Sequence, residues 1–335
     1  NLSVLRPKNS PCPNLVIFLR LDRALHSRTR TYLEQLKKSY LKVVELEVPE
    51  AKKLFWFIHN RKLLRKARLL VVCSPPSLLT ILVFFITQRR PVLDSGWTLI
   101  DGEIISRKEY GRFGSNIIRA FFIDLISFQI AKKVIFESFA QKEFVNKLFK
   151  LPERKIEVLY TGVLEGRFKS LSSMVIKNSS RKKPLHILFR GGNQNEAGLK
   201  VLLEAIGILE GRSGFIFSII SKRLNNYYEF PQMVKVESNY VSDREISDYF
   251  LGADLILGQL SNHPRLKRTI PHKFFEAAFF GKPYLTSNMG MMSGFISDGL
   301  VFGFSPGSAE SLASELIKLN QNRSELLARS KRLSD

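Results

Sequence analysis

The sequence predicts an α/β protein with two domains, each built on a parallel sheet covered by helices. The chain has 335 residues, more than one ordinary hydrophobic core accommodates. Short apolar runs alternate with helix-like patterns along both halves, which is typical of parallel sheets. A stretch rich in Ser, Lys and Arg at residues 167–184 interrupts the alternation and is predicted to link the domains. We therefore expect an N-terminal domain at residues 1–166 and a C-terminal domain at residues 185–335.

The first half is expected to alternate strands and helices. Each expected strand is a run of apolar residues, and each expected helix repeats its apolar residues every three or four positions. The longest apolar stretch, residues 69–87, is broken by Ser74-Pro75-Pro76-Ser77, whereas a membrane-spanning helix needs about 20 mostly apolar residues. We interpret it as a strand, a turn and a helix. The expected strands are 14–21, 41–48, 68–73, 91–93, 133–137 and 155–159, and the expected helices are 27–40, 52–67, 77–87, 117–133 and 141–149.

The second half continues the alternation without an internal repeat. Its last expected helix starts at Ala309. The loops after the strands are candidates for a ligand site, because the carboxyl ends of parallel strands meet at one edge of a sheet. The expected strands are 185–190, 215–221, 234–237, 253–258 and 284–287, and the other expected helices are 197–209, 243–251 and one that begins at Pro271.

The most informative segment, residues 269–286, is predicted to form a loop, a helix and a buried strand. Pro271 suits the first turn of a helix, and Gly281 suits the C′ position after the last turn. Lys273 and Glu276 are three positions apart, so both point from the same side near the helix start. A helix start attracts phosphate, and a carboxylate accepts hydrogen bonds from sugar hydroxyls. The segment predicts binding of a phosphate and a ribose; the alternative is a plain surface helix.

A second candidate, Arg190-Gly191-Gly192-Asn193, follows the expected strand 185–190. Glycines let backbone N–H groups approach a phosphate closely, although such glycines are equally often only turn residues. Lys222 and Arg223 directly follow the strand 215–221. They lie at the same expected edge of the sheet and are candidates for the same phosphate. The alternative for this pair is a solvated loop.

These segments resemble the family 4 GT-B glycosyltransferases, also called glycosyl transferases group 1. The nucleotide-binding helix of that family has a pattern close to P-x-K-x-x-E-x-x-x-x-G-K-P, which the chain matches from Pro271 to Pro283. The run from Ala253 to Glu276 is similar to a bacterial subgroup that contains A-D-x-x-L-G and then R-x-I-P-x-K-x-F-E. The resemblance covers about residues 90–320 and includes the segments 91–94, 131–138 and 155–163.

The resemblance implies a GT-B fold, in which two Rossmann-like domains face a central cleft that holds the active site. It also implies transfer of a sugar, with retention of anomeric configuration, from a nucleotide-diphosphate sugar to an acceptor hydroxyl. No cofactor is expected beyond this donor substrate, and no metal, because no D-x-D motif occurs. Helix dipole, backbone N–H groups and basic side chains would stabilise the leaving diphosphate. We expect Lys273, Glu276 and Arg190 to be catalytic, and Gly191, Gly192, Asn193, Lys222, Arg223, Pro271 and His272 to bind the donor.

The chain departs from the family pattern in both halves. Gly192 and Ala197 stand where most members carry an arginine and a lysine for the diphosphate, a feature that the bacterial subgroup shares. The usual glycine-rich loop of the first domain is also absent. An acceptor phosphate could instead meet Arg23, His26 or Arg28. The alternative is that these three residues are ordinary surface charges.

The net charge of +22 is concentrated in the N-terminal half, where residues 1–150 hold 27 Lys and Arg against 12 Asp and Glu. Such a balance attracts nucleic acid, anionic lipid or phosphorylated substrates. No carboxylate occurs between Ala51 and Leu93. In the helix there, an apolar stripe is predicted to pack on the sheet, while other apolar residues fall among cations and favour an anionic membrane surface. The stripe consists of Trp56, Phe57, Leu63, Leu64 and Ala67, and the second group of Leu54, Phe55 and Ile58.

We expect the acceptor to be a lipid-linked or polysaccharide glycan. With two cysteines and no visible signal peptide, the chain suits a reducing cytoplasm, and we expect it to be peripheral at the inner face of the membrane. Three alternatives remain open. The basic helix could simply be solvated, the protein could be a non-catalytic GT-B module that binds a nucleotide sugar or a partner enzyme, or it could bind nucleic acid. The last is disfavoured, because no RNA-binding motif accompanies the charge.

Overall fold

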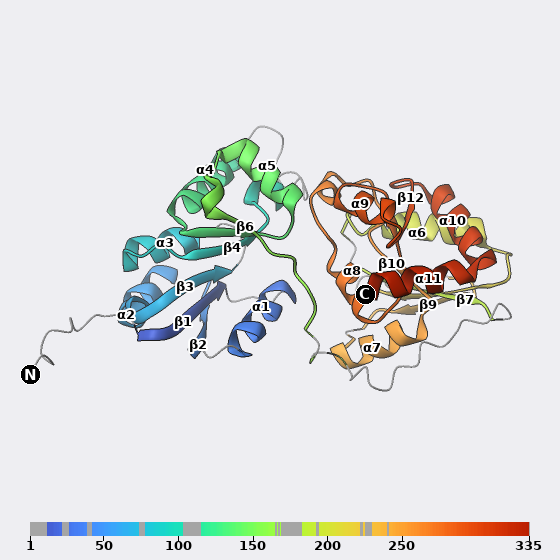
Figure 1. Cartoon of the computed structure of the whole chain (residues 1–335), viewed down its shortest axis with the longest axis horizontal. Helices are drawn as coiled ribbons and strands as arrows, with labels where there is room; N and C mark the ends of the chain where they lie inside the picture. Colours follow the sequence, from blue (N-terminus) through green and yellow to red (C-terminus); the bar gives the residue numbers. More distant parts are fainter. Residues whose placement is uncertain are drawn as a thin grey trace, which may run out of the picture. The chain divides into compact units, whose positions relative to one another are not determined.

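The computed structural model describes residues 12–21, 27–38, 42–73, 78–102, 115–164, 166, 168, 183–191, 194–221, 224, 230–239 and 241–334. The chain forms two compact units, Asn1–Thr161 and Gly162–Asp335 (Figure 1). Each unit holds a six-stranded sheet whose strand pairings are parallel. The predicted α/β class with two parallel sheets is therefore confirmed. None of the helices in the described ranges combines the length and apolarity needed to cross a membrane.

The first unit has the strand order β2-β1-β3-β4-β5-β6. Along the chain its elements are β1 (Cys12–Leu21), α1 (Ser27–Lys38), β2 (Lys42–Val48), α2 (Lys53–Lys66), β3 (Ala67–Cys73), α3 (Leu78–Thr87), β4 (Val92–Gly96), α4 (Ser115–Ile130), β5 (Lys133–Phe136), α5 (Phe139–Phe149), the short 3₁₀ helix η2 (Glu153–Lys155) and β6 (Ile156–Val158).

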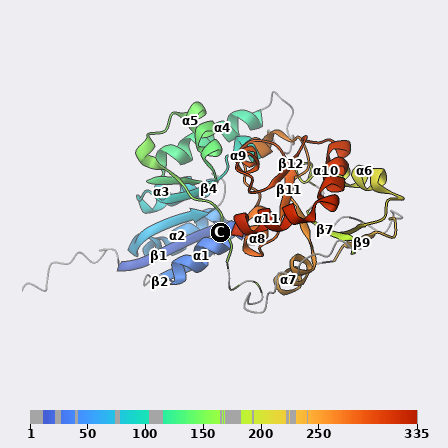
Figure 2. The ribbon, with the colours of Figure 1, turned by 45° about the vertical axis from the view of Figure 1, so that its right-hand side comes forward.

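Helices cover both faces of the first sheet (Figures 1 and 2). Alternate residues of β1 point to opposite faces, as in any strand. Ile17 joins the core beneath α2, α3, α4 and α5, whereas Phe18 packs with Leu33 of α1 on the other face. The chain changes face because β1 lies between β2 and β3 in the sheet, and right-handed crossovers in opposite directions place their helices on opposite sides.

The second unit has the strand order β12-β11-β10-β7-β8-β9. Its elements along the chain are β7 (Leu185–Arg190), α6 (Leu199–Leu209), β8 (Phe215–Ile220), β9 (Val234–Glu237), α7 (Asp243–Gly252), β10 (Leu255–Leu257), the 3₁₀ helix η5 (Pro264–Lys267), α8 (His272–Phe279), β11 (Tyr284–Ser287), α9 (Met291–Ser297), β12 (Phe302–Phe304), α10 (Ala309–Gln321) and α11 (Arg323–Ser334).

The second sheet also lies between two layers of helices. Residues of α6 and α10 build the core on one face, and residues of α7, α8 and α9 build the core on the other. Phe168, within the stretch predicted as a linker, packs on Phe279 and Phe280 and belongs to this second core. The direction of the strand order reverses between β7 and β10. In open parallel sheets, ligands bind beyond the carboxyl ends of the strands at such a reversal.

The predicted elements match the structure to within a few residues at most of their ends. Three features differ from the expectation. The sequence did not predict α9 or β12, which have seven and three residues and are too short to show a period. The final helix ends at Gln321 and a second one, α11, follows Asn322. Pro271 is not inside α8 but is its N-cap residue, with extended backbone angles.

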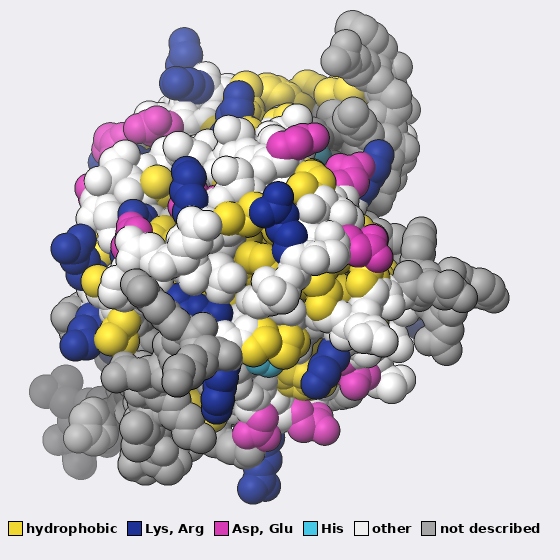
Figure 3. All heavy atoms as spheres, turned by 90° about the vertical axis from the view of Figure 1, so that its right-hand side faces the viewer, with side chains coloured by type: hydrophobic (Ala, Val, Ile, Leu, Met, Phe, Trp, Pro, Cys, Tyr) yellow, Lys and Arg dark blue, Asp and Glu magenta, His cyan; other side chains and the backbone are white. Residues whose placement is uncertain are grey.

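Figure 3 shows one face of the molecule on which Lys and Arg side chains are interspersed with Asp and Glu side chains. The large positive net charge does not make a patch of one sign on this face. Mixed charges of this kind are typical of an ordinary solvated surface.

Gly198 lies where two loops approach each other closely at the carboxyl edge of the second sheet. It precedes α6 with φ of 72°, and a Cβ there would lie 2.6 Å from the backbone nitrogen of Ser261. We expect Gly198→Ala to destabilise the protein by about 1–3 kcal/mol. Gly207, within α6, has open space around its Cβ position, so Gly207→Ala should stabilise it by roughly 0.5–1 kcal/mol. Urea unfolding of both variants measures this, and effects of the same sign would contradict it.

Candidate functional site

The start of α8 lies at the carboxyl edge of the second sheet and carries the residues singled out from the sequence. Its other end is fixed by a Schellman motif, in which Gly281 N–H bonds to Ala278 O and Lys282 N–H bonds to Ala277 O. Gly281 has φ of 58°, which suits glycine at the predicted C′ position. The Lys282 ammonium then donates to the Leu251 and Ala253 carbonyls at the end of α7. The Gly-Lys-Pro sequence after α8 thus holds two helix ends.

Glu276 is completely buried, and its carboxylate lies between two basic groups. Arg190, the last residue of β7, forms an ion pair with Oε2. His272 Nδ1 lies 3.1 Å from Oε1, one turn earlier on α8. Burial alone would raise the pKa of Glu276, but Arg190 and His272 outweigh it and lower that pKa to about 2. The carboxylate is therefore ionised at neutral pH.

Lys273 is also buried, and its ammonium is directed toward the strands. It donates a 3.0 Å hydrogen bond to the carbonyl of Gly258, just beyond β10, and lies 4.9 Å from the ring centre of Phe189. Burial and the charge of Arg190 lower the pKa of Lys273 to about 7, against the opposing effect of Glu276. At neutral pH this ammonium is close to losing its proton, so its charge depends on what lies beside it.

The sequence predicted that Lys273 and Glu276 project together toward a ligand. The structure instead directs both side chains into the protein, toward Gly258 and Arg190. The reason is that α8 packs its first turns against the ends of β7 and β10, so that side chains three residues apart both meet the sheet edge. Lys273 and Glu276 therefore lie at the expected carboxyl edge of the second sheet, but they are buried there in a cluster of charged side chains.

His272 is the member of this cluster with unused hydrogen-bonding capacity. Its side chain is 20% exposed, and its Nδ1 lies beside Glu276 Oε1. The other ring nitrogen, Nε2, is buried and has no hydrogen-bond partner within the described part of the chain. Buried polar atoms normally find a partner. The imidazole is therefore a candidate contact for a ligand at the start of α8.

Glycines and a backbone hydrogen bond bring the loops after β7 and β10 together. Leu260 N–H bonds to Ala197 O across the two loops. A Cβ at Gly191 would lie 2.8 Å from the Phe189 ring, and one at Gly258 would lie 2.4 Å from the Tyr284 hydroxyl. Neither glycine can carry a side chain without displacing its neighbour. The other candidates here, Gly192, Asn193, Lys222 and Arg223, lie outside the described residues.

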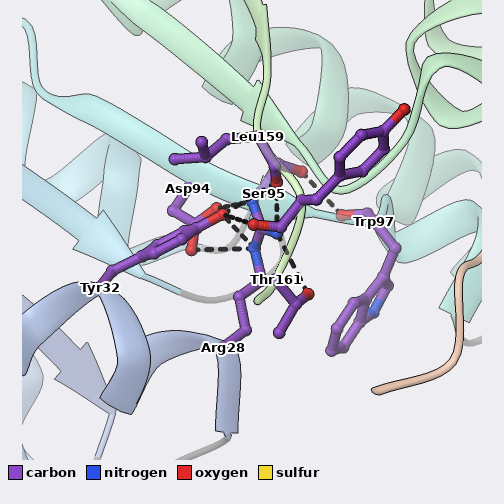
Figure 4. Close-up of polar contacts among 8 residues, drawn as sticks. Arg28, Tyr32, Asp94, Ser95, Trp97, Leu159 and Thr161 are labelled. Atoms are coloured by element: carbon purple, nitrogen blue, oxygen red, sulfur yellow. Dashed lines mark hydrogen bonds and ion pairs between the residues drawn. The ribbon is translucent and has the colours of Figure 1, made fainter. Parts of the chain in front are cut away.

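A second polar cluster lies in the first unit and centres on Arg28 of α1 (Figure 4). The guanidinium binds Asp94 of β4 through Nε at 3.0 Å and through its terminal nitrogen at 2.8 Å. It also donates to the Leu159 carbonyl at 2.8 Å and stands over the ring of Tyr32. Burial alone would lower the pKa of Arg28, but the charge of Asp94 outweighs it and raises that pKa. Burial also raises the pKa of Asp94, against the charge and hydrogen bonding of Arg28. The pairing therefore rests on the geometry, in which two guanidinium nitrogens donate to one buried carboxylate.

Arg28 was predicted either to meet an acceptor phosphate or to be a surface charge. It is neither, because its side chain is only 9% exposed and is bound to Asp94. The Tyr32 hydroxyl bonds to Leu159 O at 2.9 Å, so α1 holds the chain just after β6 through two side chains. Sequence analysis included Asp94 only in the segment 91–94 of the family resemblance and gave it no role. Arg23 and His26 lie outside the described residues.

Neither a family model nor a curated protein matches the chain, but solved structures do. HepE from Anabaena in complex with UDP and glucose is similar at a TM-score of 0.65 and 14% identity, over 95% of this chain and 93% of that one. Sucrose-phosphate synthase from Thermosynechococcus elongatus is similar at a TM-score of 0.68 and 11% identity, over 96% and 93%. The chain has the GT-B fold.

The GT-B fold alone does not decide the reaction. A protein described as a UDP-N-acetylglucosamine 2-epimerase from Listeria monocytogenes is also similar, at a TM-score of 0.59 and 12% identity over 95% of this chain and 90% of that one. GT-B architecture therefore occurs with more than one chemistry on nucleotide sugars, and one fold commonly hosts several activities. The activity has to be argued from the residues.

The Arg28–Asp94 pair should be essential for the stability of the first unit. Arg28→Met and Asp94→Asn each leave a buried charge without its partner, and each should cost about 3–5 kcal/mol. The double variant should cost far less than the sum, because no lone charge remains. The exposed pair Lys37–Glu34 is the control and should show a coupling of at most about 0.5 kcal/mol. Urea unfolding of both cycles measures the couplings. Additive costs at Arg28 and Asp94 would show that the pair is not coupled.

Proposed function

We propose that the protein is a glycosyltransferase that moves a sugar from a nucleotide-diphosphate sugar to an acceptor hydroxyl. The observation that carries the proposal is the charge cluster at the start of α8. There Arg190 and His272 flank the carboxylate of Glu276, and the Lys273 ammonium lies nearby on the Gly258 carbonyl, at the strand-order reversal of a GT-B fold. The cluster has more basic groups than acidic ones, so it suits a diphosphate.

The chemistry of transfer explains what these groups would do. The bond between the anomeric carbon and the diphosphate oxygen breaks as the bond to the acceptor oxygen forms, and negative charge accumulates on the departing nucleotide. Positive groups held in place before the reaction stabilise that charge without reorganising. Arg190 is held by Glu276, and Lys273 is held by the Gly258 carbonyl. The start of α8 adds the partial charge of its N–H groups.

The donor contacts follow from the same geometry. We assign the diphosphate to the start of α8, Pro271 and the backbone of Gly191, with Gly192, Asn193, Lys222 and Arg223 as further candidates. His272 has the free ring nitrogen to bond a donor hydroxyl. HepE in its complex with UDP and glucose supports a uridine nucleotide as the first donor to examine. Glu276 orients Arg190 and His272, and reaches the ribose only if that pairing opens.

The finer parts of the proposal concern the acceptor and its location. We propose transfer with retention of configuration to a lipid-linked or polysaccharide glycan, at the cytoplasmic face of the membrane. The cationic, partly apolar helix α2 supports a membrane location.

A thermal-shift screen with UDP, GDP, ADP and their sugars identifies the donor, and product analysis then separates transfer from epimerisation. Donor binding with no turnover on any acceptor would favour a non-catalytic module.

Donor affinity should depend on Lys273 and Glu276. Lys273→Met and Glu276→Gln keep much of the side-chain shape. The first removes a positive group from the site, and the second releases Arg190 from the carboxylate that positions it. Each should weaken donor binding by about tenfold or more, since a charged hydrogen bond contributes about 1.5–3 kcal/mol. Lys200→Met, at an exposed position of α6, should bind normally. Isothermal titration with the nucleotide sugar measures this, alongside thermal unfolding to confirm folding.

The same titration has an expected pH dependence. Because the pKa of Lys273 is about 7, its side chain is increasingly a neutral amine above that pH in the free protein, and a bound diphosphate would have to restore its proton. Affinity should therefore fall as pH rises above 7, by up to about tenfold per pH unit. Lys273→Met should remove this slope. An identical pH profile in both proteins would contradict a role for the Lys273 charge.

Transfer should not need a divalent cation. The proposal assigns charge stabilisation to Arg190, Lys273 and the start of α8. We expect the rate of transfer to stay within about twofold when EDTA replaces Mg²⁺, because fixed positive groups already neutralise the diphosphate. The measurement is a transfer assay with the identified donor, run with EDTA and after back-titration with Mg²⁺ or Mn²⁺. Activity that is lost in EDTA and restored by the metal would overturn this assignment.

A further inference from the structure

Three neighbouring helices of the first unit expose large apolar side chains to water. α2 packs on α3, and α3 packs on α4, so the three form one layer over the sheet. We call their outer surface the α2–α4 face. Phe55 of α2 is 73% exposed, Phe85 of α3 is 61% exposed, and Ile118 of α4 is 61% exposed. Single exposed apolar residues are ordinary, but a contiguous group marks an interaction site.

α4 is apolar on its outer side. Ile118, Phe122 and Ile126 are spaced four residues apart and are all exposed, forming one apolar ridge along the helix. The opposite side of α4 is apolar too, since Ala120 and Phe128 are buried on the sheet. A surface helix of a globular protein normally turns polar residues outward. The outer ridge of α4 therefore lacks the usual solvated composition.

α2 adds cations beside apolar residues. Phe57 and Leu64 are fully buried against the sheet, as the predicted stripe required, while Leu63, predicted to belong to that stripe, is 38% exposed. Arg61, Lys62 and Lys66 are exposed on the same helix. The predicted separation of α2 into an inward stripe and an outward mixture of apolar and basic residues is thus present, with Leu63 on the outward side.

The sign of the charge on the α2–α4 face is uniform. The three helices contain one acidic residue, Asp124 of α4, and it is fully buried. Its carboxylate accepts hydrogen bonds from the Leu99 and Ile100 backbone N–H groups. Every charge that these helices expose is therefore positive. An apolar surface interspersed only with cations complements an anionic lipid surface. Two copies of it would repel each other.

We propose that the α2–α4 face docks onto an anionic bilayer, with the α4 ridge in the interfacial region and the α2 cations at the head groups. This supplies the membrane that the proposed acceptor needs and so deepens the proposed function. Its test needs neither donor nor acceptor, so a failure to dock and a failure to transfer sugar are separate results.

The first experiment removes the charge. The full chain is co-sedimented with phosphatidylcholine vesicles, with and without phosphatidylglycerol, at low and high salt. The wild-type protein should bind the vesicles that contain phosphatidylglycerol more tightly than the vesicles of phosphatidylcholine alone. Arg61→Glu/Lys62→Glu/Lys66→Glu should weaken that binding by at least about 100-fold, at about fivefold for each lost cation, and the three new carboxylates add repulsion. Lys200→Glu, an exposed position of α6 in the second unit, should bind like wild type.

The second experiment tests the apolar ridge. Binding through charge alone disappears at high salt, whereas insertion leaves a salt-resistant fraction. Ile118→Ser/Phe122→Ser should lose that fraction, and Ile208→Ser, 45% exposed on α6, should keep it. In a separate pair of variants made on a Trp56→Phe/Trp97→Phe background, which removes the two native tryptophans, brominated lipids should quench the new fluorophore of Phe122→Trp but not that of Ile208→Trp.

Two results would overturn the proposal. One is equal vesicle binding by wild type, the charge variant and the ridge variant, or equal quenching at positions 122 and 208. The other is a self-association in analytical ultracentrifugation that Phe122→Ser abolishes, with no vesicle binding by wild type. That result would assign the face to a second copy of the chain. Thermal unfolding of each variant confirms that it is folded.

Discussion

The buried carboxylate of Glu276 is the constraint on which the proposed donor site depends. An ionised group removed from water is costly unless opposite charge and hydrogen-bond donors surround it. Arg190 supplies the charge from the end of β7, and His272 lies beside it at the start of α8. The pairing therefore fixes α8 against the switch point of the second sheet. A loss of this carboxylate would release Arg190 as well.

The same cluster gives a physical reason for the departures from the family pattern. Gly192 and Ala197 stand where the family that the sequence resembles carries two cations on the glycine loop. Arg190 and Lys273 provide positive charge at the same edge of the sheet, from the end of a strand and from the first turn of a helix. In the proposed function these two groups, held by Glu276 and by the Gly258 carbonyl, take over the neutralisation of the diphosphate.

The first unit uses its charges in two opposite ways. Arg28 and Asp94 are buried together and connect α1, β4 and the chain after β6, so their contribution is to hold the scaffold. On the outer surface of α2, α3 and α4 the cations have no acidic neighbour on those helices, since Asp124 is buried and bound to backbone N–H groups. The buried Arg28–Asp94 pair stabilises the fold of the first unit. The proposed docking depends on the uniformly positive charge of the outer surface.

The sequence by itself determined the alternation of strands and helices, the parallel sheets and most element ends, because these depend on local periods and on turn residues. It also determined the end of α8 at Gly281 and the burial of Phe57 and Leu64, which follow from backbone preference and helical spacing. α9 and β12 are too short to carry such a period. Only the tertiary structure decided that Glu276 meets Arg190, 86 residues away, and that Arg28 meets Asp94, 66 residues away. Spacing along a helix shows which side of the helix a residue occupies. Strand order and packing decide which distant side chain that residue contacts.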